Sequence, residues 1–205
     1  MKLGAFCIFY TCFGGIAFAY LLPQNIVLVG MPNSGKSFLG AKLAQHLSIP
    51  HYDTDDYNPY MKELKTTKKD WRCFREEEHK IVSHFLETPD PKIISTGGGI
   101  IDNHQTFHRF LNRDPKQDLI IQVIRHYEPK ETRKNLPDTM EKLWLKRSKF
   151  YMAITDVYYW NHRSPSDFLK WFEENIKHAV NKNSIKIKQS RITKSTLKLD
   201  GGTIL

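Results

Sequence analysis

The segment from Ile26 to Phe38, IVLVGMPNSGKSF, constrains the fold more than any other part of the chain. It begins as a short apolar run, which is typical of a buried parallel strand, and it ends in the first residues of an amphipathic helix. Between the two lies the pattern Gly-x-x-x-x-Gly-Lys-Ser, formed by Gly30, Gly35, Lys36 and Ser37. A strand, a glycine-containing turn and a helix in this order predict a loop that wraps around phosphate groups.

The residue types in this loop support that prediction. Glycine lets the backbone pass close to a phosphate without a Cβ clash, and successive backbone amides can donate into the loop. We expect these donors at Asn33, Ser34, Gly35, Lys36, Ser37 and Phe38. Lys36 would reach the β- and γ-phosphates, and the Ser37 hydroxyl would ligate Mg²⁺. We therefore expect a nucleoside triphosphate, namely ATP, as the phosphate donor.

Apolar runs and amphipathic segments alternate along the rest of the chain. Strands are expected at 25–29, 51–55, 92–95 and 118–124 and near Tyr158. Helices are expected at 36–47, 74–86, 139–153 and 165–180. This alternation predicts an α/β fold with three layers and a five-stranded parallel sheet.

The sheet is expected to lie in one domain at residues 23–180, with an apolar leader at 1–22 and a basic tail at 181–205. The leader has no charge from Leu3 to Leu22, and AFA at 17–19 resembles a signal-peptide cleavage site. It can be a signal peptide or anchor, an apolar extension packed on the domain, or a faulty or fragmentary start. An exported enzyme would find little ATP, so we expect a cytoplasmic protein with no membrane partner unless the leader is an anchor.

Charge and cysteine content exclude several functional classes. The net charge is +9, but seven Lys or Arg residues and no acidic residue lie between 175 and 199, so the remainder is close to neutral. The basic stretch could be a nucleic-acid patch or a solvated linker; no aromatic residue is interleaved for base stacking, which favours the linker, and we expect no nucleic-acid partner. Three cysteines form no disulfide framework, and nine histidines show no metal-ligand spacing.

Two aspartates at the end of the second expected strand are candidates for contact with the phosphate acceptor. In α/β sheets the carboxyl ends of the strands line the ligand crevice. If Asp53 and Asp55 lie on one strand, they point to the same side. One carboxylate could hold Mg²⁺ through water, and the other could accept a proton from an attacking hydroxyl. The alternative is that both are turn-forming residues.

Two further stretches point to a small anionic acceptor. Arg75, at the expected start of a helix, could present its guanidinium to a carboxylate, with Glu78 one turn later to orient it. The alternative is a solvated, charged helix start. The glycines of TGGG, at 97–99, permit close approach of a small ligand or form a flexible turn.

Taken together, these motifs resemble the shikimate kinase family, in the nucleoside-monophosphate-kinase branch of P-loop folds. The family pattern runs GxxxxGKS, DTD, FRxxE and GGG, and the resemblance extends from about Gln24 to His162. Its later part, with KLWLKRSKFY and DVYYW, looks most like the kinase domain of the fungal pentafunctional arom polypeptide. The resemblance implies ATP-dependent phosphorylation of the 3-hydroxyl of shikimate, in the chorismate pathway of aromatic amino acid biosynthesis.

The resemblance also implies roles at the acceptor end of the site. Arg75, Arg147 and the glycines Gly97, Gly98 and Gly99 would bind shikimate, with both arginines around its carboxylate.

At the phosphate end, the resemblance implies that Asp53 and Ser37 serve Mg²⁺ and that Asp55 holds the shikimate hydroxyls and acts as base. Arg133 would be the lid arginine that closes over the phosphates. Lys36, Asp55 and Arg133 would then form the catalytic set.

The chain departs from the family pattern in its lid and at its ends. The family lid usually reads Arg-Pro, whereas here Arg133 precedes Lys134 and the proline is displaced to Pro137. The tail resembles the linker that follows the kinase domain in arom proteins, so we also consider a larger arom-like polypeptide as its context.

Two other functions stay open at this point. One is a non-catalytic, shikimate-kinase-like sensor. The altered lid and the truncated tail argue for it, whereas the intact Lys36, Ser37, Asp53 and Asp55 argue against it. The other is a different small-molecule kinase, such as a gluconate kinase, which the paired arginines and the GGG stretch argue against.

Overall fold

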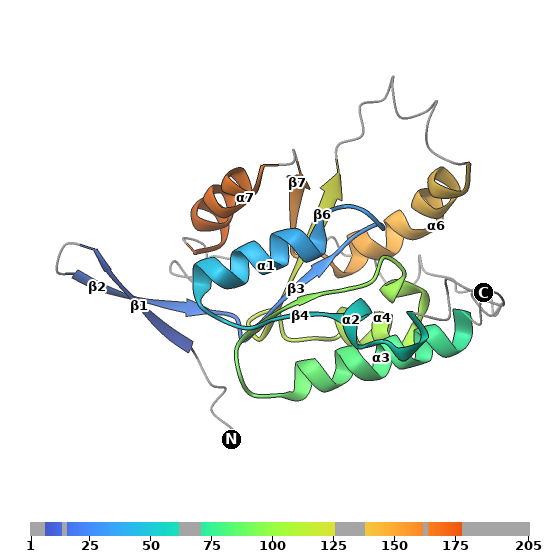
Figure 1. The fold of residues 1–205 in the computed structure, drawn as a ribbon, viewed down its shortest axis with the longest axis horizontal. Helices are drawn as coiled ribbons and strands as arrows, with labels where there is room; N and C mark the ends of the chain where they lie inside the picture. The colour runs from blue at the N-terminus through green and yellow to red at the C-terminus, as the bar shows by residue number, and fades with distance from the viewer. Residues whose placement is uncertain (1–6, 14–15, 62–70, 126–137, 162–163, 178–205) are drawn as a thin grey trace.

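The computed structural model describes residues 7–13, 16–61, 71–125, 138–161 and 164–177 (Figure 1). Within these ranges a five-stranded parallel sheet has the order β4-β5-β3-β6-β7. Its strands are β3 (Asn25–Val29), β4 (His51–Asp53), β5 (Lys92–Ser95), β6 (Asp118–Arg125) and β7 (Val157–Asn161). The predicted five-stranded parallel sheet is therefore confirmed.

Helices cover both faces of this sheet. They are α1 (Lys36–Leu47), α2 (Thr54–Tyr57), α3 (Trp71–Glu87), α4 (His104–Leu111), α6 (Asp138–Ile154) and α7 (Pro165–Phe172). Short 3₁₀ turns occupy Pro59–Met61 and Ile100–Asp102, and a π-helical turn, Glu173–Lys177, follows α7. The predicted three-layer α/β architecture is confirmed.

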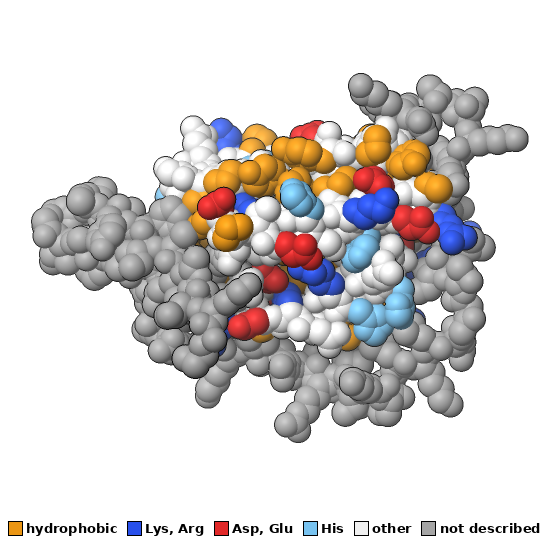
Figure 2. Space-filling model, turned by 90° about the horizontal axis from the view of Figure 1, so that it is seen from below, with side chains coloured by type: hydrophobic (Ala, Val, Ile, Leu, Met, Phe, Trp, Pro, Cys, Tyr) orange, Lys and Arg blue, Asp and Glu red, His pale blue; other side chains and the backbone are white. Residues whose placement is uncertain are grey.

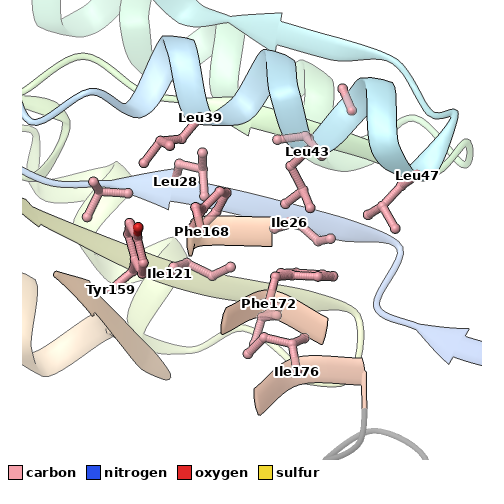
Figure 3. Close-up of a cluster of buried hydrophobic side chains, with 14 of the residues drawn as sticks. Ile26, Leu28, Leu39, Leu43, Leu47, Ile121, Tyr159, Phe168, Phe172 and Ile176 are labelled. Carbon is pink, nitrogen blue, oxygen red and sulfur yellow. The ribbon is translucent and has the colours of Figure 1, made fainter. Parts of the chain in front are cut away.

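The central strand β3 divides the core into two apolar clusters, because alternate residues of a strand point to opposite faces. Ile26 and Leu28 face α1 and α7, where they pack with Leu39, Leu43, Phe168 and Phe172 (Figure 3). Val27 and Val29 face the other layer, formed by α3, α4 and α6. Burial on both faces explains why β3 is apolar at every position after Asn25.

The prediction of a strand at 51–55 is wrong for residues 54 and 55. β4 ends at Asp53, whose side chain accepts a hydrogen bond from the backbone N–H of Asp55 at 3.1 Å. Asp53 therefore acts as the N-cap of α2, and Asp55 lies in the first turn of that helix. An N-cap aspartate with two acidic residues in the following turn is typical of a helix start. A helix therefore begins where the short strand pattern was expected to continue.

Other boundaries also differ from the prediction. α3 begins at Trp71, so Arg75 lies one turn inside the helix instead of at its start. α7 ends at Phe172 and gives way to the π-helical turn, whereas one helix was expected to continue to 180. α4 was not predicted, because its apolar face is short and rests mainly on Phe107 and Phe110.

The leader contains a β-hairpin. β1 (Cys7–Phe13) and β2 (Ile16–Leu22) pair antiparallel in a separate two-stranded sheet, with Cys7 opposite Leu22. The hairpin lies to one side of the main sheet, next to the start of β3 (Figure 1). Leu22, at its end, is buried in the cluster beneath α1. Among the described residues, no helix has both the length and the apolar character to cross a membrane. The domain limits at 23 and 180 stay predictions.

The outer face over α3 and α4 mixes acidic, basic and histidine side chains with apolar ones (Figure 2). Opposite charges are paired there, as in Lys80 with Glu77 and Arg109 with Glu87. This face therefore differs from the continuous basic patch that is typical of nucleic-acid binding.

Candidate active site

The glycine-containing turn between β3 and α1 has the geometry of a phosphate-binding loop. Gly30 and Gly35 have φ values of 145° and 96°, which side chains rarely adopt. A Cβ at Gly30 would come closer than 3.0 Å to the Val123 carbonyl oxygen, and one at Gly35 closer than 3.0 Å to the Asn161 amide. Both positions therefore require glycine for conformational and steric reasons.

The Lys36 side chain is buried against this loop. Its ammonium donates to the carbonyl oxygens of Gly30 at 3.0 Å and Met31 at 2.8 Å. Burial lowers the pKa of Lys36 to about 8, although the nearby carboxylates of Asp55 and Asp53 oppose the shift. Because these acceptors are uncharged carbonyls, an anion at the loop would be a stronger partner for the ammonium.

A cavity of about 660 Å³ opens in front of the loop. Its lining combines residues from the loop, from α2 and α3, and from the stretch after β5, including Asn33, Gly35, Lys36, Ser37, Phe38, Asp55, Arg75, Gly97, Gly98 and Gly99. A second cavity of about 260 Å³ lies beside it and is lined by Asn33, Gly35, Phe38, Leu39, Arg125 and Asn161. Most of the residues that the sequence pointed to thus meet in one place.

The three glycines after β5 are tightly packed. A Cβ on Gly97 would lie within 2.8 Å of Asp55 Oδ1, and one on Gly99 would collide with the guanidinium groups of Arg75 and Arg147. Gly97 also donates its N–H to Thr54 Oγ1 at 3.0 Å. These contacts show that the turn is closely packed, with side chains of the site against the glycines.

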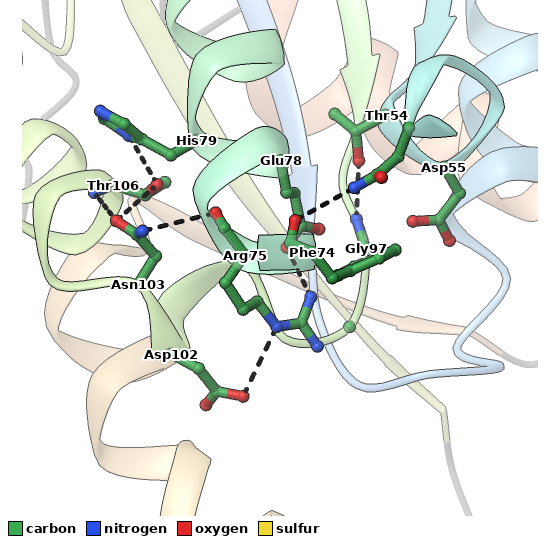
Figure 4. Close-up of polar contacts among 12 residues, drawn as sticks. Thr54, Asp55, Phe74, Arg75, Glu78, His79, Gly97, Asp102, Asn103 and Thr106 are labelled. Atoms are coloured by element: carbon green, nitrogen blue, oxygen red, sulfur yellow. Dashed lines mark hydrogen bonds and ion pairs between the residues drawn. The ribbon is translucent and has the colours of Figure 1, made fainter. Parts of the chain in front are cut away.

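Arg75 and Glu78 form an ion pair on the inner face of α3 (Figure 4). Arg75 Nη1 donates to Glu78 Oε2 at 2.5 Å, and Glu78 is 1% exposed. The guanidinium of Arg75 also lies over the Phe74 ring, 4.9 Å from its centroid. Burial raises the pKa of Glu78, and Arg75 opposes the shift. The solvated helix-start alternative is therefore wrong, since Glu78 is buried and the Arg75 side chain is 15% exposed.

Arg147 reaches the same place from α6. Its Nη1 donates to the Gly98 carbonyl oxygen at 2.8 Å, and its Nε donates to Asp102 Oδ1 at 3.1 Å. Asp102 also accepts from Nη2 of Arg147 and lies 4.0 Å from Nε of Arg75. The two guanidinium groups thus come together beside Gly99, with one carboxylate near both.

Asp55 lies at the other end of the glycine loop, beside Gly97. Burial raises its pKa, as does the neighbouring Asp53, whereas Lys36 and Arg75 lower it. A carboxylate with a raised pKa near a buried lysine is suited to accept a proton from a bound hydroxyl group.

Oxygen ligands suitable for Mg²⁺ are present at the start of α1 and at the end of β4. Ser37 supplies a hydroxyl at the edge of the cavity, and Asp53 has a second carboxylate oxygen beyond the one that caps α2. Mg²⁺ usually keeps several waters and binds through one or two protein ligands plus substrate phosphates. These residues therefore fit Mg²⁺, although no cluster of three acidic, histidine or cysteine side chains for a metal occurs among the described residues.

Several residues of the site were missed by sequence reasoning. Asp102 holds Arg147, and Thr54 anchors Gly97. Asn161 donates to the Ser34 carbonyl oxygen at 2.8 Å. Tyr151 is the easiest to have found, because it lies four residues after Arg147 and so shares a helix face with it. The predicted lid arginine, Arg133, lies outside the described residues.

Comparison with known proteins agrees with this geometry. The family model described as Shikimate kinase matches residues 32–182, which is more than half of the chain. A shikimate kinase of Clostridium botulinum (strain Okra / Type B1) is 32% identical over 143 residues, and the match covers 62% of this chain and 82% of that protein. Pentafunctional AROM polypeptide 2 of Lodderomyces elongisporus is 27% identical over 158 residues. That match covers 70% of this chain but 10% of the polypeptide, so the chain spans about a tenth of the length of such relatives.

A solved structure shows the same fold. The shikimate kinase from Acinetobacter baumannii in complex with shikimate superposes with a TM-score of 0.58 at 20% identity, covering 76% of this chain and 95% of that one. The match of the family model, the order of the motifs and the shared fold lead to one conclusion. This chain belongs to the shikimate kinase family.

Proposed function

We propose that the chain transfers the γ-phosphoryl group of ATP to the 3-hydroxyl group of shikimate. The observation that carries this proposal is that the two ends of the glycine loop at 97–99 face side chains of opposite charge. Two guanidinium groups lie at its Gly99 end, and the Asp55 carboxylate lies at its Gly97 end. A small molecule with a carboxylate on one side and hydroxyls on the other matches this arrangement.

ATP is the proposed donor because the phosphate loop and its lysine line the same cavity as the acceptor residues. Amides of the loop and the N-terminus of α1 would bind the phosphates. The smaller cavity beside Phe38, Arg125 and Asn161 has room for the nucleoside part. Mg²⁺, held by Ser37 and Asp53, would supply positive charge next to the phosphate oxygens.

Catalysis would consist mainly of positioning and charge neutralisation. Arg75 and Arg147 would bind the shikimate carboxylate, which fixes the ring relative to the loop. Asp55 would accept the proton of the 3-hydroxyl as that oxygen bonds to the γ-phosphorus, and Lys36 would stabilise the charge on the transferring group. Arg133 is proposed to close over the phosphates and complete the catalytic set.

The biological setting is part of the proposal. We propose a cytoplasmic enzyme of aromatic amino acid biosynthesis, with residues 23–180 as its kinase domain. Its relation to AROM polypeptides makes a larger polypeptide a further proposed context, in which residues 181–205 would act as a linker.

The test is an ADP-release assay with ATP and Mg²⁺, run with shikimate, with gluconate and with no acceptor. We expect ADP release to depend on shikimate, with shikimate 3-phosphate identified by mass spectrometry. Lys36→Ala serves as the inactive control. Binding of shikimate by calorimetry without any turnover would overturn the enzyme proposal in favour of a sensor, and turnover with gluconate alone would overturn the choice of acceptor.

A further inference from the structure

The hydroxyl group of Tyr151 lies between two loops that the proposed reaction uses separately. One is the phosphate loop, residues 30–37, and the other is the glycine loop, residues 97–99. Tyr151 is 0% exposed. Its hydroxyl oxygen is 2.7 Å from the Gly98 carbonyl oxygen and 3.1 Å from the Gly30 carbonyl oxygen. One buried side chain of α6 therefore touches the donor loop and the acceptor loop.

Each of these two carbonyl groups has a second donor, and both donors are proposed ligands of the substrates. The Gly30 carbonyl accepts from the Lys36 ammonium at 3.0 Å. The Gly98 carbonyl accepts from Arg147 Nη1 at 2.8 Å. Hydrogen bonds thus run without interruption from the lysine that would bind phosphate, through Tyr151, to the arginine that would bind the carboxylate.

The hydroxyl group has one proton for two acceptors. It can donate fully to the Gly98 carbonyl or to the Gly30 carbonyl, but not to both at once. A tyrosine hydroxyl keeps its proton at neutral pH even at its ordinary pKa of about 10, and burial raises the pKa of Tyr151 further. The choice between the two carbonyls depends on which of them lacks another donor, because an unpaired buried carbonyl is costly.

We propose that Tyr151 is a positioning residue that couples nucleotide binding to acceptor binding. The inference rests on the function proposed above. When Lys36 turns to the β-phosphate, the Gly30 carbonyl loses its donor and the Tyr151 hydroxyl turns toward it. The Gly98 carbonyl is then left to Arg147 alone. This holds the Arg147 guanidinium more firmly beside Gly99, where the acceptor carboxylate binds.

The predicted consequence is that each substrate tightens the binding of the other by the same factor, as linkage requires. The coupling passes through a single switched hydrogen bond, so we expect it at the lower end of the usual range, about fivefold. Simple loss of a buried hydroxyl would instead lower stability and leave this factor unchanged.

The first test measures shikimate affinity by calorimetry with and without saturating ADP and Mg²⁺, in the unmodified chain, Tyr151→Phe and Tyr159→Phe. Tyr159 is the matched control, since it is 4% exposed and its hydroxyl is 3.5 Å from the Ser164 carbonyl oxygen, away from both loops. We expect ADP to tighten shikimate binding about fivefold in the unmodified chain and in Tyr159→Phe. In Tyr151→Phe the ratio should be close to one.

The second test needs no variant and so does not depend on folding of Tyr151→Phe. AMP lacks the β-phosphate that would draw Lys36 away from Gly30. Saturating AMP should therefore leave shikimate affinity unchanged in the unmodified chain, whereas ADP should raise it.

The outcomes separate this inference from the proposed function. Turnover with shikimate, together with equal coupling in Tyr151→Phe and the unmodified chain, would overturn the Tyr151 inference and leave the function standing. The same holds if AMP couples as strongly as ADP, or if ADP does not tighten shikimate binding at all. Failure of the unmodified chain both to bind and to phosphorylate shikimate would overturn the function, and the inference with it.

Discussion

The Asp102 carboxylate accepts hydrogen bonds from two guanidinium nitrogens of Arg147, Nε and Nη2. This contact joins α6 to the turn that follows the glycine loop. Both side chains are largely buried, with exposures of 8% for Arg147 and 18% for Asp102. A two-point contact fixes the plane of the guanidinium as well as its position. The third guanidinium nitrogen of Arg147, Nη1, donates to the Gly98 carbonyl oxygen.

Asp102→Asn should therefore weaken shikimate binding more than ATP binding. A hydrogen bond to a charged group contributes about 1.5–3 kcal/mol, so the KM for shikimate should rise about 10- to 150-fold. Steady-state kinetics with each substrate varied in turn would measure this. The control is Glu87→Gln, which removes an exposed partner of Arg109 away from the cavity. Equal increases in both KM values would contradict the assignment of Arg147 to the acceptor.

The loss of charge on Lys36 should be visible in the pH dependence of activity. Its pKa is lowered to about 8 by burial, so the ammonium loses its proton as the pH rises through that value. We expect kcat/KM for ATP to be high below about pH 8 and to fall above it. Lys36→Arg, whose side chain does not titrate in this range, should have lower activity and lack this alkaline fall. The same alkaline fall in Lys36→Arg would show that another group causes it.

Asp55→Asn should lower kcat, with only a modest loss of shikimate affinity because Arg75 and Arg147 still hold the carboxylate. Asparagine keeps the shape and one acceptor oxygen but cannot take a proton, and general bases typically contribute about 10²–10⁴-fold. Because the pKa of Asp55 is raised, activity of the unmodified chain should fall on the acid side as this carboxylate gains a proton. Turnover and calorimetric titration on both proteins would check this, and an unchanged kcat would remove Asp55 from the role of base.

Alanine substitutions at the two ends of the glycine loop should have different effects. In Gly99→Ala the new Cβ meets the guanidinium groups of Arg75 and Arg147, so we expect mainly a higher KM for shikimate. In Gly97→Ala it meets Asp55 and Glu78, so we expect mainly a lower kcat. Kinetics of the two variants, with thermal unfolding as a check on folding, would test the proposed orientation of shikimate. An identical pattern in both would argue against it.

The hairpin of β1 and β2 should be dispensable for catalysis, but its last residue should not be dispensable for stability. Leu22 is 4% exposed and packs in the cluster beneath α1. A chain that begins at Leu22 and one that begins at Pro23 should both be active. The second should be less stable by about 1.5–3 kcal/mol, the contribution of a buried leucine side chain. Chemical denaturation of the two would measure the difference, and loss of activity in both would show that the hairpin belongs to the catalytic unit.

Local sequence was sufficient for the donor half of the site. The apolar run of β3, the two glycines and the periodicity of α1 all lie between Asn25 and Leu47, and the helix bounds at 36–47 agree with the prediction. The phosphate loop is formed within one strand–loop–helix unit, so the order of residues in the sequence is enough to predict it. Asp53 and Asp55 are also close in sequence. They were expected on one strand because the role of Asp53 as the N-cap of α2 was not recognised.

Only the tertiary structure decided the contacts among the proposed acceptor residues. Arg75 and Arg147 lie on different helices, and Asp102, between them in sequence, is shared by both. Tyr151 bonds to Gly30, 121 residues away. No periodicity of a single segment records such contacts, because they depend on how α3, α6 and the glycine loop pack against the sheet. The sequence alone therefore predicted the phosphate loop and, through a family resemblance, the acceptor residues. Packing decided how those residues meet and that Asp102 and Tyr151 contact them.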